Sequence, residues 1–308
     1  MTAVESAAAL LGDRAQRDVP IGPLTTYRVG GAAELFVRVE ADDDLARVAE
    51  AVSASGVPTL VVGNGSNLLV ADAGFAGLAI TLGEAFEDVT IRGSTVTAGA
   101  AASLPVLARR TAAAGLTGFE WAVGVPGSIG GAVRMNAGGH GSDMAASLTR
   151  VRVVDLRTGD DGWMAASDLA LAYRHSSITP GQIVAAAELA LAHGDRAQSE
   201  AEIAEIVRWR RAHQPGGQNA GSVFTNPAHD SAGRLIDVAG CRGMRRGTAV
   251  VSDKHANFFI ADAGGRADDV HELMLAVQAR VLEVHGVKLE PETQLVGFDL
   301  HPRLKVES

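Results

Sequence analysis

The stretch GVPGSIGGAVRMNAGG, residues Gly124–Gly139, decides how the rest of the sequence is interpreted. It holds six glycines, one proline and one asparagine in sixteen residues. Glycine loses more backbone entropy on folding than any other residue, so the stretch predicts neither a stable helix nor a stable strand. A chain accepts that cost where its backbone must come very close to another group, and long irregular loops are usually functional. We therefore expect a ligand-binding loop, with an irregular bend between subdomains as the alternative.

A second glycine-rich loop follows the predicted strand PTLVVG, residues 58–63. This loop consists of Gly63, Asn64, Gly65, Ser66 and Asn67. A strand that runs into Gly-x-Gly exposes successive backbone N–H groups, which bind phosphate oxygens well. The third glycine and the long helix of a dinucleotide-binding fingerprint are missing, so a tight turn explains this loop equally well. Two such loops in one region nevertheless favour an extended ligand with a pyrophosphate, such as a dinucleotide.

The composition describes an ordinary globular protein. The 308 residues are 47% hydrophobic and 20% charged, which is enough for two or three domains with sizeable cores. The net charge of −9 disfavours a nucleic-acid-binding protein. Cys241 is the one cysteine, so no disulfide framework is expected, and this suits a reducing compartment. The N-terminus lacks a basic signal-peptide region, and no apolar run approaches about 18 residues. We expect a cytoplasmic protein without membrane insertion.

Strand and helix patterns alternate along the chain without a fixed repeat. Strands are expected at 33–40, 58–63, 77–83, 150–156 and 293–298, a hairpin at 89–100, and helices at 42–55, 104–114 and 267–286. A polar turn is expected after residue 156. A further helix is expected to begin at Ser199, which would cap it together with a following glutamate. The class is α+β, with two domains in series and a boundary near 193–199.

Seven short motifs occur together and in order. They are TTYRVGG (25–31), GNGSN (63–67), PGSIGGAVRMNAGG (126–139), YRHS (173–176), AGSVFTNP (220–227), VSDKHANFFI (251–260) and LEPE (289–292). In this combination the chain resembles the UDP-N-acetylenolpyruvoylglucosamine reductases, the flavoenzymes of an early step in peptidoglycan synthesis. The resemblance covers roughly residues 21–298. Seven ordered motifs make it far more specific than any one of them.

The resemblance implies a fold and a cofactor. It implies a FAD-binding domain of the vanillyl-alcohol-oxidase (PCMH) type in two α/β subdomains at 21–195. An α+β substrate-binding domain follows at 196–308. Whether its last strand joins the first domain stays open at this point. FAD is expected to be bound non-covalently and to receive hydride from NADPH. The implied cofactor-binding residues are Tyr27, Arg28, Gly63, Asn64, Gly65, Ser66, Asn67, Pro126, Gly127, Ser128, Gly130, Gly131 and Asn136.

The resemblance also implies a catalytic set of three residues. Arg174 would bind the enolpyruvyl carboxylate, a role that suits a guanidinium because its planar fork meets a carboxylate bidentately. Glu292 would lie opposite Arg174 and help to polarise the forming enol. Ser222 would protonate C2 of the substrate, and because serine is a weak acid it needs a neighbour that assists.

Further residues are implied on the substrate side. They are Tyr173, Asn226, His255, Asn257 and Arg211. Basic residues are frequent in this half of the sequence, and some of them should meet the diphosphates of the UDP-sugar and of NADPH. Which of them do so stays open at this point. No metal is expected, and a monomer is favoured.

The sequence departs from the family pattern at three points. The interval between Arg174 and Ser222 is too short for the lobe with a tyrosine-bearing loop that one class inserts there, so the chain resembles the shorter second class. Thr225 stands where many members have a lysine, which puts a cationic contact in doubt. His140 follows a Gly-Gly pair, as a histidine does where FAD is attached covalently in other enzymes of this fold. Its position differs, and we expect an ordinary residue.

Two other functions fit part of the pattern. One is a flavoenzyme of the same fold that acts on another hydroxy acid or sugar. The other is a non-catalytic nucleotide-binding relative. The joint presence of YRHS, AGSVF and LEPE disfavours both, because a different substrate or a binding role needs no such set.

Overall fold

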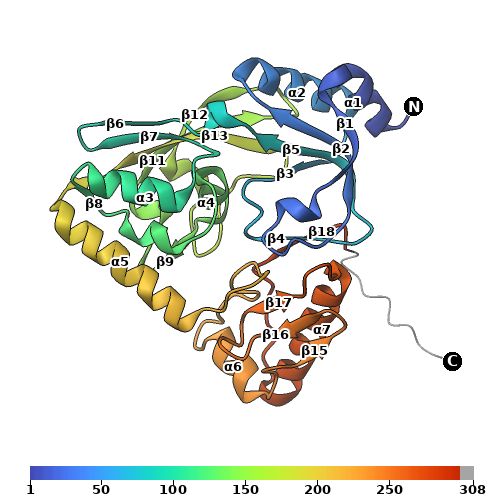
Figure 1. Ribbon diagram of the computed structural model, residues 1–308. Helices are drawn as coiled ribbons and strands as arrows, with labels where there is room; N and C mark the ends of the chain where they lie inside the picture. The colour runs from blue at the N-terminus through green and yellow to red at the C-terminus, as the bar shows by residue number, and fades with distance from the viewer. Residues whose placement is uncertain (299–308) are drawn as a thin grey trace.

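The computed structural model describes residues 1–298 and consists of two lobes. The first lobe is built from two sheets with their helices, and the second is formed by the orange and red part of the chain in Figure 1. Among the described residues, no helix is both long and apolar enough to cross a bilayer. The deep cavity of the molecule lies where the two sheets and the second lobe meet, so the fold is described from that point of view.

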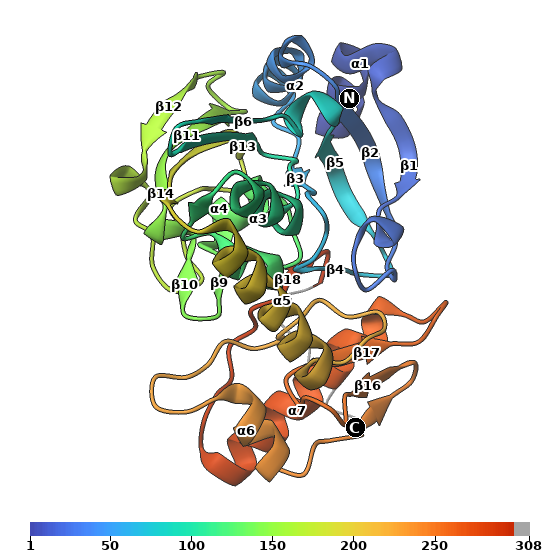
Figure 2. The same cartoon turned by 60° about the vertical axis from the view of Figure 1, so that its left-hand side comes forward.

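The first sheet has the strand order β1-β2-β5-β3. Its strands are β1 (Gln16–Pro20), β2 (Ala32–Val39), β3 (Thr59–Val61) and β5 (Phe75–Leu82), and only the β1–β2 pair is antiparallel. Helices α1 (Ala3–Leu11) and α2 (Asp42–Ser55) pack on one face of it (Figures 1 and 2). The prediction of α2 is confirmed, and Gly56 ends this helix in the left-handed conformation. Helix α1 and strand β1 were not expected.

The second sheet is entirely antiparallel, in the order β12-β11-β13-β7-β6. Its strands are β6 (Val89–Arg92), β7 (Thr95–Gly99), β11 (Leu148–Asp155), β12 (Asp161–Ala165) and β13 (Gln182–Ala190). The hairpin β6–β7 is as predicted. The polar turn expected after residue 156 is present, and strand β12, which was not expected, follows it. An edge strand with exposed side chains lacks the apolar alternation that reveals a strand in the sequence. Helix α3 (Leu104–Ala113) is confirmed and packs in the core of this sheet.

The glycine-rich stretch contains a helix, α4 (Ile129–Met135), so the expectation that it forms none is wrong for these residues. The Ser128 hydroxyl accepts a hydrogen bond from the N–H of Gly131 and caps the helix. Asn136 ends it with a φ of 38°. A Cβ on Gly130 would lie 3.0 Å from the Cβ of Ala100, just beyond β7. The absence of a side chain at Gly130 lets the short helix lie close to the sheet. This close packing offsets the poor helix propensity of glycine.

Helix α5 (Arg196–His213) runs from the first lobe to the second (Figure 2). It begins earlier than predicted, because Asp195 caps it by accepting the N–H of Gln198 at 2.8 Å. The capping role expected for Ser199 is wrong. This serine is buried within the helix, and its hydroxyl donates to Glu120 at 2.5 Å. The N-terminal half of α5 thus packs in the first-lobe core.

The second lobe is a small α+β unit. It contains α6 (Ala232–Val238), β15 (Arg245–Arg246), β16 (Ala249–Val251), β17 (Phe259–Ala261) and α7 (Ala267–His285). The apolar positions predicted for α7 are confirmed: Val270, Leu273, Met274, Val277 and Val281 are all buried in this core.

The last strand returns to the first lobe. Strand β18 (Gln294–Val296) pairs in parallel with β4 (Leu68–Val70), which follows the Gly63–Asn67 loop. Two small pairs complete the fold: β8 (Leu116–Thr117) with β14 (Ala192–His193), and β9 (Gly138–Gly139) with β10 (Ser142–Asp143). The division at 195/196 stays a prediction.

Candidate functional site

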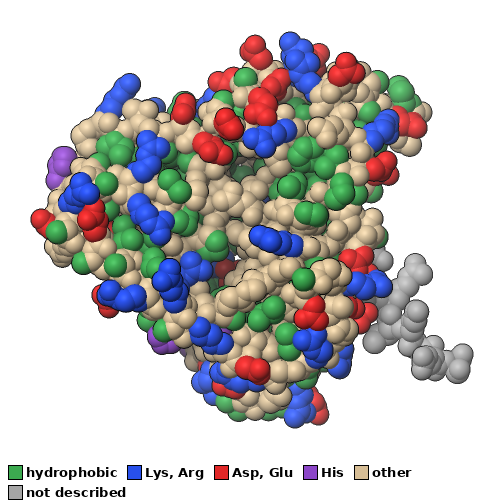
Figure 3. Space-filling model, in the orientation of Figure 1, with side chains coloured by type: hydrophobic (Ala, Val, Ile, Leu, Met, Phe, Trp, Pro, Cys, Tyr) green, Lys and Arg blue, Asp and Glu red, His purple; other side chains and the backbone are tan. Residues whose placement is uncertain are grey.

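A cavity of about 1320 Å³ lies between the lobes. The first sheet, α3, α4, the C-terminal end of α5 and the second lobe all contribute to its wall. Figure 3 shows the hollow in the middle of the face, with Lys and Arg side chains gathered beside it over α5. A site that is formed by several elements at once is the usual place for a large ligand.

The two glycine-rich loops meet in this cavity. A Cβ on Gly63 would lie 2.6 Å from the hydroxyl oxygen of Ser128, and one on Gly127 would lie 3.1 Å from that of Ser66. A side chain at either glycine would fill the space between the loops. Glycine at both positions therefore lets the two loops lie this close together on the cavity wall. The predicted residues that line the cavity here are Gly63, Asn64, Gly65, Ser66, Asn67, Pro126, Gly127, Ser128, Gly130 and Gly131.

The polar groups of the cavity fit an anionic cofactor with hydrogen-bonding ends. The hydroxyl of Thr81 lines it, is buried, and has no hydrogen-bond partner among the described residues. Burial lowers the pKa of Arg134 and that of Arg210, because both guanidinium groups are removed from water. Within residues 1–298, neither of these arginines pairs with a carboxylate. Cations left without acids on a cavity wall match a bound diphosphate.

Arg174 and Glu292 form an ion pair on the cavity wall. The Nε of Arg174 lies 2.6 Å from Oε1 of Glu292, and its Nη2 donates to the carbonyl of Gly138 at 3.0 Å. Arg174 has a φ of 54°, in the tight turn between Ala172 and His175. Burial raises the pKa of Glu292, and the nearby Arg174 opposes this shift only in part.

Ser222 comes to the same wall from the second lobe. It forms an antiparallel bridge with Phe258, and both residues line the cavity. The next residue, Val223, accepts the backbone N–H of Glu292 at 2.8 Å. Backbone pairing thus brings the predicted acid Ser222 beside the predicted pair, although the three residues come from separate segments.

Three residues predicted to bind the cofactor do not line the cavity. Tyr27 is fully buried in the second-lobe core, where burial raises the pKa of its phenol. Arg28 follows it in a turn with a φ of 54° and also lies outside the cavity wall. The amide of Asn136 is used internally, since it donates to Ala172 and Asp143 and accepts from the N–H of Ala145. The cofactor roles of these three residues stay predictions.

Most of the predicted substrate residues also have internal partners. Asn257 accepts from and donates to the backbone of Phe224, at 3.0 and 2.8 Å, and Asn226 accepts the N–H of Ala232. Neither lines the cavity, and the same holds for Tyr173 and His255. The Tyr173 ring is exposed and lies 5.1 Å from the guanidinium carbon of Arg174. Of this set, Arg211 lines the cavity.

Other cavity residues were missed or left open by the sequence. Arg109 and Arg134 line the wall but were not singled out. A lone cation inside the glycine-rich stretch was the available signal for Arg134. Lys254 and Arg210 were left among unassigned basic residues. Lys254 donates to the carbonyl of Arg211 at 2.6 Å, and both residues line the cavity. They add positive charge to the cavity wall.

Comparison with known proteins agrees with this geometry. The family model for the UDP-N-acetylenolpyruvoylglucosamine reductase C-terminal domain matches residues 213–296, and a FAD binding domain model matches 33–160. A reductase of that name from Acidiphilium cryptum is 44% identical over 282 residues, 91% of each chain. One from Heliobacterium modesticaldum is 43% identical over 90% of this chain and 89% of its own. The chain belongs to the UDP-N-acetylenolpyruvoylglucosamine reductase family.

A solved structure supports the assignment at the level of the fold. The UDP-N-acetylenolpyruvylglucosamine reductase from Thermus caldophilus superposes with a TM-score of 0.81 at 37% identity, over 92% of this chain and 99% of that one. Membership in the reductase family confirms the predicted fold class, α+β with a PCMH-type FAD-binding domain and an α+β substrate domain. It also confirms the enzyme class, an oxidoreductase that uses FAD and NADPH.

Proposed function

We propose that this chain reduces the enolpyruvyl group of UDP-N-acetylglucosamine enolpyruvate with NADPH, giving UDP-N-acetylmuramate for peptidoglycan synthesis. The observation that carries the proposal is the presence of Arg174, Glu292 and Ser222 on the wall of one cavity with both glycine-rich loops. A binding protein needs neither a partly buried arginine–carboxylate pair nor a proton donor beside it. The reaction requires both, together with a flavin.

The two glycine-rich loops are the part of the cavity that suits FAD. Residues 63–67 offer backbone N–H groups with little side chain in the way, and Arg134 adds positive charge. In the second loop the N–H groups of residues 129–131 are already bonded within the protein, so this loop contributes mainly through Gly127 and Ser128. Bound FAD supplies the hydride chemistry that connects NADPH with the sugar nucleotide. Non-covalent binding is proposed because His140, the candidate for a covalent link that the sequence offers, packs edge-on against Trp209 at 5.2 Å.

Arg174 is proposed to hold the substrate carboxylate. Its Nε and Nη2 are already directed by Glu292 and Gly138, so the fork is fixed in place before the substrate arrives. A fixed guanidinium stabilises the negative charge that develops as C2 becomes carbanionic, without reorganisation during the reaction. Glu292, whose pKa is raised by burial, keeps Arg174 oriented and can share a proton with the forming enol.

Ser222 is proposed to deliver the proton to C2 through its Oγ. The residue lies in extended backbone that pairs with Phe258, and both residues line the cavity. A serine is a poor acid alone, so the positive charge of Arg174 on the same wall is what makes the transfer feasible.

Arg211 is proposed to contact the diphosphate of the sugar nucleotide. It lines the cavity at the C-terminal end of α5, and within residues 1–298 its guanidinium has no carboxylate in ion-pair distance. A cytoplasmic, monomeric enzyme is proposed as well. The buried free thiol of Cys241 supports a reducing compartment.

The proposal is tested with the purified protein in two steps under nitrogen. The protein should be yellow, and NADPH should bleach it. Addition of the enolpyruvyl sugar nucleotide should then restore the colour and yield the lactyl ether. If bleaching occurs but the colour does not return, the substrate is a different one. If acid precipitation of the protein releases no flavin, either the cofactor or its non-covalent attachment is wrong.

A further inference from the structure

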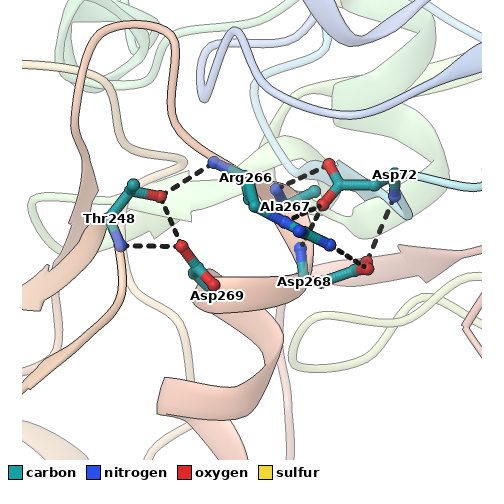
Figure 4. Close-up of polar contacts among 6 residues, drawn as sticks. All are labelled: Asp72, Thr248, Arg266, Ala267, Asp268 and Asp269. Atoms are coloured by element: carbon teal, nitrogen blue, oxygen red, sulfur yellow. Dashed lines mark hydrogen bonds and ion pairs between the residues drawn. The ribbon is translucent and has the colours of Figure 1, made fainter.

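Helix α7 of the second lobe receives its N-terminal cap from the first lobe. Arg266, which precedes the helix, makes no side-chain cap. Instead the carboxylate of Asp72 accepts the N–H groups of Ala267 and Asp268, at 3.0 and 3.3 Å (Figure 4). Its Oδ2 also lies 3.1 Å from Nε of Arg266, and its own N–H donates to Asp268. One carboxylate thus meets the positive end of a helix and a guanidinium together.

Asp72 belongs to the segment that holds the cofactor loop. It lies two residues beyond β4, which begins directly after Gly63–Asn67 and pairs with β18. The side-chain amide of Asn67 donates to the carbonyl of Glu292 at 3.0 Å, so the same segment is joined to the catalytic pair. The position of Asp72 is therefore fixed relative to the flavin side of the cavity.

The first turn of α7 leads to the opposite wall. Asp269 accepts from both the N–H and the hydroxyl of Thr248, each at 2.7 Å, as Figure 4 shows. Thr248 immediately precedes β16, which pairs with β17. The loop between these strands carries Lys254 and Phe258, both on the cavity wall. A continuous set of hydrogen bonds thus runs from Asp72 to the wall that faces the flavin side.

The second lobe has another attachment near the reaction centre. There Val223 accepts the N–H of Glu292 at 2.8 Å, and Glu290 accepts that of Thr225 at 3.0 Å. These bonds place Ser222 on the segment that Asn67 of the first lobe holds through Glu292, and Tyr27 and Leu69 pack in the second-lobe core. Asp72 adds a polar contact between the lobes at the first turn of α7, next to the bonds from Thr248 to Asp269.

We propose that Asp72 is a positioning residue, which holds the β16–β17 wall of the cavity against the sugar nucleotide by capping α7 from the first lobe. The inference rests on the proposed function, because it assigns this wall to the substrate. Without the cap, the wall samples more open positions, and substrate binding weakens in proportion to the fraction that remains competent. Ser222 and the cofactor loop keep their places.

The kinetic test compares Asp72→Ala with Asp161→Ala. Asp161 makes a comparable carboxylate–arginine pair with Arg152, but inside the first lobe and away from the cavity. We expect Asp72→Ala to raise the KM for the sugar nucleotide about tenfold, because the free-energy cost of losing a good helix cap corresponds to a factor of that size. The kcat and the FAD content should be nearly unchanged. Asp72→Asn keeps one acceptor for the helix and should fall between. Asp161→Ala should leave KM unaltered.

A second measurement does not depend on the reaction. Hydrogen exchange of the amides at 249–261 should be faster in Asp72→Ala than in the wild type, whereas exchange at 63–70 should be unchanged. A lower melting temperature with unchanged KM and unchanged exchange at 249–261 would reduce Asp72 to a stabilising contact and overturn the inference. If the wild type does not turn over the sugar nucleotide, the proposed function fails by itself, and the exchange result still decides the role of Asp72.

Discussion

Arg174 adopts a backbone conformation that few non-glycine residues tolerate, with a φ of 54°. Such strain costs on the order of 1–3 kcal/mol and persists where the surroundings impose it, commonly at functional sites. Here the Ala172–His175 turn directs the guanidinium towards Glu292. The backbone of Glu292 pairs with Val223, the neighbour of Ser222. The local strain thus helps to place a charge, a carboxyl and a hydroxyl on one wall.

Ser222→Ala separates the two halves of the reaction. Bleaching by NADPH should stay within about twofold of the wild type, since no proton is delivered to carbon in that step. Recovery of colour with the sugar nucleotide should slow by roughly 10²- to 10⁴-fold, the range of general acid catalysis. Stopped-flow absorbance measures both on one sample. Equal slowing of the two halves would remove Ser222 from the role of proton donor.

At the scale of elements, the predictable parts were those with a repeating pattern. Helix α7 was foreseen because its apolar positions recur at helical spacing, and the Gly63–Asn67 loop because it follows a strand. Helix α4 was not foreseen, because its capping by Ser128 and its approach to Ala100 outweigh the poor propensity of glycine. The cap of α7 could not be predicted at all. Its donor and acceptor are 195 residues apart, and no local pattern connects them.

Two glycines with a similar positive φ differ in their surroundings. Gly65 in the cofactor loop has a φ of 59°, and a Cβ there would overlap the carbonyl of Leu24. Gly56 after α2 has a φ of 67° and open space around it. Gly56→Ala should therefore cost about 1 kcal/mol of unfolding free energy, the cost of the conformation alone. Gly65→Ala should cost about 3 kcal/mol or more and also weaken FAD binding.

The comparison is made by urea unfolding and by fluorescence titration with FAD. Gly56→Ala serves as the control and should bind FAD like the wild type. Equal destabilisation by the two substitutions, with FAD affinity unchanged in both, would show that the close approach at Gly65 has no part in forming the cofactor site.

The contact between α5 and the first lobe depends on a buried carboxylate. Burial raises the pKa of Glu120, but hydrogen bonds from Ser199 and from the backbone of Gly118 outweigh that effect, and the net pKa is lowered. Because the pKa of Glu120 is lower in the folded than in the unfolded chain, the ionised carboxylate stabilises the fold at pH values above the unfolded-state pKa. This stability is lost as the pH falls through the folded-state pKa. Ser199→Ala should destabilise the protein by about 1–2 kcal/mol at neutral pH.

The pH dependence of the destabilisation by Ser199→Ala shows whether it acts through the ionised carboxylate of Glu120. The difference in melting temperature between wild type and Ser199→Ala should be largest at neutral pH and should narrow below about pH 4. Ser55→Ala is the matched control, since that serine also lies in a helix but bonds to the carbonyl of Ala51. Its effect should not vary with pH. A constant difference for Ser199→Ala would exclude Glu120 as the cause.

At the scale of the whole molecule, the charge of the cavity wall is opposite in sign to the net charge of the chain. The chain carries a formal charge of −9, yet the cavity has more arginines and lysines than carboxylates on its wall. A cationic hollow in an acidic protein attracts anionic ligands locally and leaves other polyanions unbound. The cations that line it are Arg38, Arg109, Arg134, Arg174, Arg210, Arg211 and Lys254.

The rate at which NADPH enters should therefore depend on salt. With limiting NADPH, the second-order rate of bleaching should fall several-fold as the ionic strength rises from about 0.01 M to about 0.3 M, because the screening length shortens. The bleaching rate at saturating NADPH reports the step after binding and should stay constant. A second-order rate that does not respond to salt would mean that the cavity charges do not steer the ligand.

The pairing of β18 with β4 has a consequence for biosynthesis. Glu292 and its partner Asn67 are 225 positions apart, so β18 leaves the ribosome long after β4. The early part of a chain can fold during translation, but this lobe then lacks one strand and one wall of its cavity. We therefore expect nascent chains halted before Glu292 to bind FAD poorly. FAD would then bind only after β18 has been synthesised, and incomplete chains would not bind the cofactor.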